Sequence, residues 1–169
     1  MVPFVSIIIP IADDKGYFRY CLRALECQSY QRNRYEIIVV ENNKFRLPLG
    51  ISREFCTIRI SREELPGSYA ARNKGLSVTQ SDIVAFTDSD CIPRYDWLEK
   101  GVQGLLANPS CGFLGGKIEF FFKVTNRPNG IELFDSIFGL QQEYFIKKYH
   151  FASTANLFIH RKILDAVGP

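Results

Sequence analysis

The chain has 169 residues, 46% of them hydrophobic and 23% charged, which is typical of one globular domain with a core of its own. Twenty-one basic residues against 18 acidic ones give a net charge of +3. This excess is too small and too scattered to indicate a nucleic-acid-binding protein, so we expect no nucleic-acid partner.

The cysteines and the apolar runs bear on whether the protein binds zinc, spans a membrane or is secreted. None of the five cysteines forms a Cys-x-x-Cys pair, and only two histidines accompany them, which argues against a zinc site. No uncharged apolar run approaches the roughly 20 residues that span a bilayer, and the first ten residues lack the features of a signal peptide. We therefore expect a cytoplasmic chain with reduced cysteines, and leave membrane association of a longer protein open.

The first forty residues predict a strand, a helix and a second strand. Residues 4–9 form an apolar, β-branched run that Pro10 is expected to end, and residues 35–40 form another. Between them, apolar residues recur at helical spacing: Phe18, Cys21, Leu22 and Leu25. Two strands joined by a helix form a βαβ unit, which predicts a parallel sheet.

The alternation of strands and helices continues to about residue 106. Residues 56–60 predict a weaker strand, and a helix is expected from Gly67-Ser68 to about Val78. Residues 83–86 predict a third apolar strand. Asp96 is expected to cap a further helix, whose predicted buried residues are Trp97, Leu98, Gly101, Val102, Leu105 and Leu106.

Past residue 109 the pattern becomes mixed. Residues 112–122 predict one or two strands, and residues 155–160 another, followed by a helix over 162–167. A single amphipathic helix is expected over 131–147, with an apolar face formed by Phe134, Ile137, Phe138 and Phe145. The predicted class is therefore α/β: a Rossmann-like half (1–107) and an α+β extension (108–169).

Asp88-Ser89-Asp90 follows the third apolar strand. In an extended chain residues i and i+2 project to the same side, so both carboxylates are expected to address one cation. Ligands of open α/β sheets bind outside the carboxyl ends of the strands, and Mg²⁺ and Mn²⁺ favour carboxylates together with phosphate oxygens. Asp-x-Asp also arises by chance, so its position at a strand end is what predicts a site.

A second candidate is the start of the helix at Gly67-Ser68. Free N–H groups and the positive end of the helix dipole suit a phosphate there, and Arg72 could hold phosphate oxygens with two parallel hydrogen bonds. Considered alone, a capped surface helix with a solvated arginine is the simpler interpretation.

A third candidate is the end of the second strand. Glu41 and Asn42 could contact a nucleobase or a ribose there, but considered alone an ordinary loop is the better explanation of these residues.

Together these segments resemble a glycosyltransferase of family 2. The resemblance runs through nearly the whole chain, in the family's order and spacing: residues 5–10, 35–42, 71–75, 83–93, 96–98, 154–161, 164 and 167–169.

The resemblance implies a GT-A fold, a three-layer α/β/α sandwich around a mostly parallel mixed sheet. It implies transfer of a sugar from a nucleotide-diphosphate donor to an unidentified carbohydrate, lipid or protein acceptor, with inversion. A divalent metal, Mg²⁺ or Mn²⁺, is implied on Asp90, with Asp88 near the ribose or the metal. The predicted donor-binding residues are Pro10, Glu41, Asn42, Arg72, Asp88, Ser89 and Asp90.

Two departures from the family pattern affect the nucleobase pocket, so no base is predicted. Residues 11–13 (Ile-Ala-Asp) follow Pro10 where the family often has Thr or Ser with Tyr-Asn. Glu41-Asn42 stands where the family commonly has paired Asp.

The family's catalytic carboxylate lies downstream of the segment that matches residues 166–169. We therefore expect residues 1–169 to be one C-terminally truncated domain whose general base lies beyond Pro169. Such a chain is expected to bind donor, to transfer sugar poorly and to self-associate through uncovered apolar surface.

Two other interpretations compete with this one. A haloacid-dehalogenase-like phosphatase also places Asp-x-Asp after an apolar strand, but normally after the first strand of the chain, and with Thr or Val next. A nucleotide-sugar-binding module without catalysis is the non-enzymatic alternative.

Overall fold

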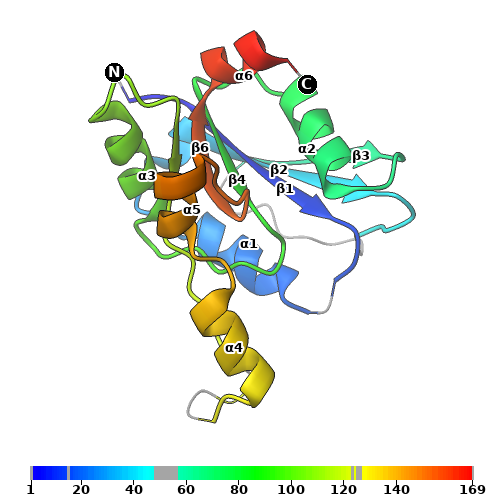
Figure 1. Cartoon of the computed structure of the whole chain (residues 1–169). Coiled ribbons are helices and arrows are strands. Elements are labelled where there is room, and N and C mark those ends of the chain that lie inside the picture. The colour runs from blue at the N-terminus through cyan, green and yellow to red at the C-terminus, as the bar shows by residue number, and fades with distance from the viewer. Residues whose placement is uncertain (1, 15, 48–56, 123, 125–126, 169) are drawn as a thin grey trace.

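The computed structural model describes residues 2–14, 16–47, 57–122, 124 and 127–168. In this part of the chain, six strands form one sheet with the order β3-β2-β1-β4-β6-β5 (Figure 1). The strands are β1 (Val5–Ile11), β2 (Tyr35–Asn42), β3 (Thr57–Glu63), β4 (Ile83–Thr87), β5 (Phe113–Gly115) and β6 (Asn156–His160). β1 to β4 are parallel, whereas β6 runs antiparallel to both β4 and β5.

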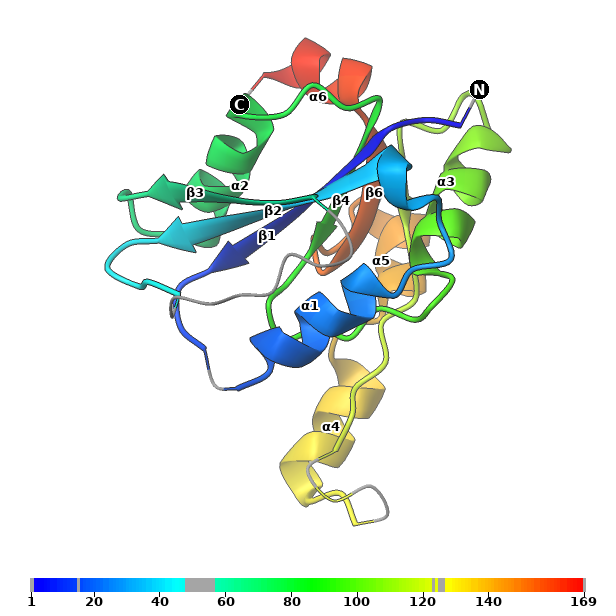
Figure 2. The same ribbon diagram turned by 180° about the vertical axis from the view of Figure 1, so that it is seen from behind.

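Helices cover both faces of the sheet (Figures 1 and 2). They are α1 (Phe18–Glu26), α2 (Ser68–Ser77), α3 (Trp97–Leu106), α4 (Gly130–Phe138), α5 (Gln142–Tyr149) and α6 (Arg161–Val167), with a 3₁₀ turn η1 (Arg32–Arg34). One core cluster joins α1 and α3 to one face of the central strands, and a second joins α2 and α6 to the other. The predicted three-layer α/β/α arrangement is confirmed.

β1 and β2 are buried along their whole length, as expected for parallel strands covered on both faces. Pro10 does not end β1, contrary to the prediction, because the strand runs on to Ile11. The pairing of β1 with β4 stops at Ile8, so on that side there is no ladder for the missing N–H of Pro10 to disrupt.

The predicted buried face of α1 is confirmed, and that of α3 is largely confirmed. Two predicted residues are exceptions. Trp97 is only half-buried, and Leu106, the last residue of α3, lies one position past the buried stripe and is 47% exposed. Asp96 makes no side-chain cap, because its carboxylate pairs with Lys100 at 2.6 Å instead.

The second half departs most from the sequence expectations. Only Phe113–Gly115 of the segment 112–122 forms a strand. The single helix expected over 131–147 is two helices, α4 and α5, separated at Gly139, where a Cβ would overlap the backbone of the last turn of α4. α4 projects away from the sheet (Figure 2), and Phe134 on its apolar face is 60% exposed. No described residue of α4 is buried, and no described helix is long and apolar enough to cross a membrane.

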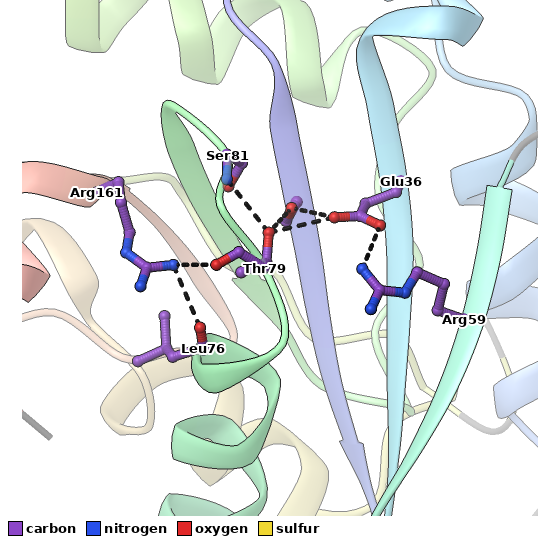
Figure 3. A network of polar contacts seen from close by, with 7 residues as sticks. Glu36, Arg59, Leu76, Thr79, Ser81 and Arg161 are labelled. Atoms are coloured by element: carbon purple, nitrogen blue, oxygen red, sulfur yellow. Dashed lines mark hydrogen bonds and ion pairs between the residues drawn. The ribbon is translucent and has the colours of Figure 1, made fainter.

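A buried polar network lies at the amino ends of the parallel strands (Figure 3). Glu36 on β2 accepts hydrogen bonds from Ser6 on β1 at 2.7 Å and from Thr79 after α2 at 3.2 Å. Arg59 on β3 pairs with the other oxygen of Glu36 at 3.3 Å. The network ties the segment after α2 to three strands.

Arg161, the first residue of α6, holds the same end of α2. Its guanidinium donates to the carbonyl oxygens of Leu76 at 3.2 Å and Thr79 at 2.5 Å (Figure 3). Carbonyls at a helix end lack partners within the helix, and a basic side chain satisfies them. The carboxyl end of α2 is therefore fixed. Its first turn lies at the other end of the helix, toward the carboxyl ends of the parallel strands.

Candidate functional site

The candidate residues gather at the carboxyl edge of the sheet, on both sides of the junction between β1 and β4. β2 and β3 lie on one side of β1, and β4 lies on the other, so the winding direction reverses at this junction. Ligands of open α/β sheets bind outside the strand ends at such a reversal. The ends of β1, β2 and β4 and the start of α2 meet here (Figure 1).

Asp88 and Asp90 stand on a turn rather than on an extended chain, so the expected i, i+2 projection is wrong. β4 ends at Thr87, and the backbone N–H of Cys91 donates to the carbonyl of Asp88 at 3.1 Å, closing a four-residue turn. The Thr87 hydroxyl donates to the Ala155 carbonyl at 3.1 Å and fixes the strand end from which the turn begins.

The turn and α2 are joined by an ion pair. Nη2 of Arg72 lies 2.6 Å from Oδ1 of Asp88, and the two side chains are 15% and 37% exposed. The Nε of Arg72 is buried and has no hydrogen-bond partner in the part of the chain that the structure describes. Sequence reasoning placed both residues in the site but did not pair them with each other, because nothing local relates positions 16 apart.

Asp90 is exposed and makes no hydrogen bond or ion pair with any other described residue, and Ser89 lies half-buried between the two carboxylates. No group of three or more His, Cys, Asp or Glu side chains that could hold a metal occurs among the described residues. A cation here would thus have at most two carboxylate ligands from this turn and would take others from a ligand. Mg²⁺ and Mn²⁺ accept such a donor set, whereas structural zinc needs a full protein shell.

Two thiols lie at the turn, that of Cys91 within it and that of Cys21 on the neighbouring helix α1. The S–H of Cys21 on α1 donates to the carbonyl of Asp88 at 3.5 Å. Burial raises the pKa of the thiols of Cys21 and Cys91, and the carboxylates of Asp88 and Asp90 raise both further. The neutral thiols therefore add no negative charge beside the two aspartates. Sequence reasoning missed this contact, since spacing carries no signal for it.

Glu41 is buried at the end of β2, and the protein already engages its carboxylate. Oε1 accepts the backbone N–H of Leu47 at 2.8 Å, and Oε2 accepts Nε of Arg62 at 3.2 Å. Arg46 lies 3.9 Å from Oε2. Glu41 therefore faces β3 and the segment after β2.

Asn42 is 3% exposed and binds the loop between β3 and α2. Its Oδ1 accepts the N–H of Gly67 at 2.9 Å, and its Nδ2 donates to the carbonyls of Leu65 at 2.8 Å and Glu63 at 3.4 Å. The end of β2 is thus joined to the start of α2.

The first strand contributes Pro10, which is buried beside Val40 of β2. Beyond it, Oδ1 of Asp14 accepts the N–H groups of Gly16 at 2.7 Å and Phe18 at 3.3 Å. This carboxylate fixes the start of α1, in the segment where the sequence departs from the family pattern.

Comparisons with known proteins agree with this fold. The chain matches the family described as Glycosyl transferase family 2 over residues 6–168. It is 36% identical over 176 aligned positions to the glycosyltransferase AglE of Haloferax volcanii, covering 99% of this chain and 56% of that protein.

Solved structures of two proteins share the fold. The mannosyltransferase PcManGT from Pyrobaculum calidifontis, in complex with GDP-Man and Mn²⁺, superposes with a TM-score of 0.72 at 19% identity, over 99% of this chain and 47% of that one. S. aureus TarS 1–349 in complex with UDP superposes with a TM-score of 0.67 at 21% identity, over 97% of this chain and 48% of that one. The chain spans about half the length of these relatives, and the GT-A fold is confirmed. Because the family match extends from residue 6 to residue 168, this chain belongs to glycosyl transferase family 2.

Proposed function

We propose that this chain is the donor-binding part of a glycosyltransferase that transfers a sugar from a nucleoside-diphosphate donor to an acceptor hydroxyl, with inversion. In this proposal residues 1–107 hold the donor and residues 108–169 face the acceptor. The observation that carries it is the ion pair of Arg72 with Asp88 at the sheet junction, with the exposed carboxylate of Asp90 two residues away.

Arg72 has the role of holding the diphosphate. Its guanidinium is mostly buried and engages a carboxylate through one nitrogen, so its geometry already suits an anion. Departure of the sugar leaves negative charge on the diphosphate, and a fixed guanidinium stabilises that charge without reorganisation.

Asp90 and Asp88 are the residues that would hold Mg²⁺ or Mn²⁺, with Ser89 between them. Such an ion supplies charge neutralisation to the diphosphate as a Lewis acid. Asp88 would then have two partners, the ion and Arg72, and the guanidinium of Arg72 would be able to turn toward phosphate oxygens.

Pro10 and Glu41 complete the proposed donor pocket at the ends of β1 and β2. Relatives with this fold hold different nucleotides, GDP-Man in one and UDP in another, so the proposal names no base. It concerns the donor side and assigns no carboxylate as general base. The phosphatase alternative loses its support, since Asp88 follows β4, with three other described strands before it in the sequence.

The test is calorimetry with UDP and GDP, in Mn²⁺ and in EDTA, on the chain and on Asp90→Asn. We expect the chain to bind at least one diphosphate in Mn²⁺, and the affinity to fall on the order of 10-fold or more in EDTA, since charge-assisted contacts contribute about 1.5–3 kcal/mol. Asp90→Asn should abolish the difference between the two buffers. Its matched control is Asp135→Asn on the exposed helix α4, which should behave as the parent. Equal affinity in Mn²⁺ and EDTA for the parent chain would refute the metal's role.

A further inference from the structure

The carboxamide of Asn42 forms hydrogen bonds with residues 63–67, which connect β3 to α2. Both hydrogens of its Nδ2 have acceptors in the carbonyls of Leu65 and Glu63, at 2.8 and 3.4 Å, and its Oδ1 accepts the Gly67 N–H at 2.9 Å. The side chain is 3% exposed. A nucleobase would therefore have to break contacts within the protein in order to be read by this amide.

The loop that Asn42 holds determines how α2 begins. Gly67 is the N-cap of α2 and has a φ of 124°, a region that side chains disfavour. A Cβ there would also lie 2.5 Å from the ring of Tyr69. Among the described residues no side-chain cap of the helix occurs. The Gly67 carbonyl accepts the Ala71 N–H at 3.2 Å within the helix, and the Gly67 N–H donates to Asn42, so the Asn42 contact joins this unusual backbone to β2.

The rest of α2 is fixed by other contacts. Gly75 lies so close to β1 that a Cβ would be 2.5 Å from Ile8, and Arg161 holds the carboxyl end of the helix. Arg72 lies one turn beyond the Gly67–Ser68 start and reaches Asp88. The direction of this first turn therefore depends on the loop and on Asn42.

We propose that Asn42 is a positioning residue for donor binding: its carboxamide fixes residues 63–67 so that the first turn of α2 presents Arg72 to Asp88 and to the donor diphosphate. The inference rests on the proposed function. Since the diphosphate is common to all nucleoside-diphosphate donors, loss of the Asn42 contacts should weaken every nucleotide by the same factor.

The test variant is Asn42→Asp, which keeps the acceptor oxygen but replaces the donor group by one that repels the Leu65 carbonyl. Asn43→Asp is the matched control: Asn43 is the next residue, is exposed, and has a φ of 56° that Asp tolerates as Asn does. Calorimetry with UDP, GDP and ADP in Mn²⁺, well below the melting temperature, should show all measurable affinities falling by a common factor, on the order of 10-fold, in Asn42→Asp. Asn43→Asp should change them less than about twofold, as expected of a surface substitution away from the contacts.

Two further measurements separate positioning from a general loss of stability. In an Arg72→Ala background, Asn42→Asp should weaken binding little more, because both substitutions remove the same contact to the diphosphate. Hydrogen exchange without nucleotide should speed up at the Gly67 amide in Asn42→Asp but not in Asn43→Asp. If Asn42→Asp does not fold, Asn42→Ser, whose hydroxyl is too short to span the loop, provides the same readouts.

The outcomes are distinct. A loss confined to one base would identify Asn42 as a base-reading residue and overturn the proposal, and so would full additivity with Arg72→Ala. Unchanged exchange at Gly67 would show that Asn42 does not hold the loop. If the parent chain bound no nucleotide, the proposed function would fail, and the exchange measurement alone would then decide whether Asn42 holds the loop.

Discussion

Replacing Arg72 by alanine should separate a structural arginine from a ligand-binding one. The free protein would lose one ion pair, 2.6 Å long, in which Asp88 is 37% exposed. Pairs this accessible to water contribute about 0–1 kcal/mol to folding. At roughly 2–4 °C per kcal/mol for a chain of this size, the melting temperature should fall by less than about 4 °C.

The effect of Arg72→Ala on binding should be larger. If Arg72 holds phosphate oxygens, the variant loses charge-assisted hydrogen bonds of about 1.5–3 kcal/mol, a roughly 10- to 150-fold weaker affinity for nucleoside diphosphate. Arg72→Lys should lie between the parent and Arg72→Ala, because lysine keeps the charge but not the planar fork. Calorimetry and thermal unfolding on the same samples measure both quantities.

The control is Lys74→Ala, which removes one positive charge from the same helix without breaking a side-chain hydrogen bond among the described residues. It should leave the affinity within about twofold of the parent. A melting temperature that drops by 10 °C in Arg72→Ala while the affinity stays unchanged would contradict the reasoning, and Arg72 would then serve only to hold the Asp88 turn.

Two further predictions concern packing and thiol chemistry. A Cβ at Gly101 on α3 would overlap the buried ring of Phe158. In Gly101→Ala, overpacking should therefore lower the free energy of unfolding by about 1–3 kcal/mol, and the better helix propensity of alanine should offset roughly 1 kcal/mol of that loss. Urea unfolding measures the net change. Gly104→Ala on the same helix meets only a flexible leucine methyl and should be neutral or stabilising. If Gly101→Ala were as stable as Gly104→Ala, the close packing of α3 on Phe158 would be disproved. At pH 8, peptide mapping after maleimide treatment should show Cys27 labelled well before Cys21, because burial raises the pKa of the Cys21 thiol and suppresses its thiolate. Equal labelling rates would show that the α1 face opens in solution.

Much of the fold could be predicted from local pattern. The β-branched runs of β1 and β2 are continuous because both faces of a parallel sheet are covered, and that burial is visible residue by residue. The helical spacing from Phe18 to Leu25 likewise identifies the buried face of α1. The order of these segments also indicated the family, which the family match over residues 6–168 confirms.

The tertiary structure decided how the candidate residues are used. Arg72 and Asp88 form an ion pair, and Asn42 binds the loop before α2, because separate loops bring distant residues to one edge of the sheet. Residue spacing along the chain does not encode such pairings. The turn at Asp88 likewise depends on where the pairing of β4 with β6 stops.

The apolar face of α4 shows that the sequence does not predict whether a predicted apolar face is buried. Periodicity shows that a helix is amphipathic, and three residues of the predicted face, Phe134, Ile137 and Phe138, lie on α4, whereas Phe145 lies on the separate helix α5. Whether such a face is covered depends on which other elements reach it, and in the described chain none buries it. The sequence by itself thus determined the strands and helices of the first half, their order and the family. Contacts between distant segments decided the geometry of the site, because those contacts depend on the whole fold rather than on neighbouring residues.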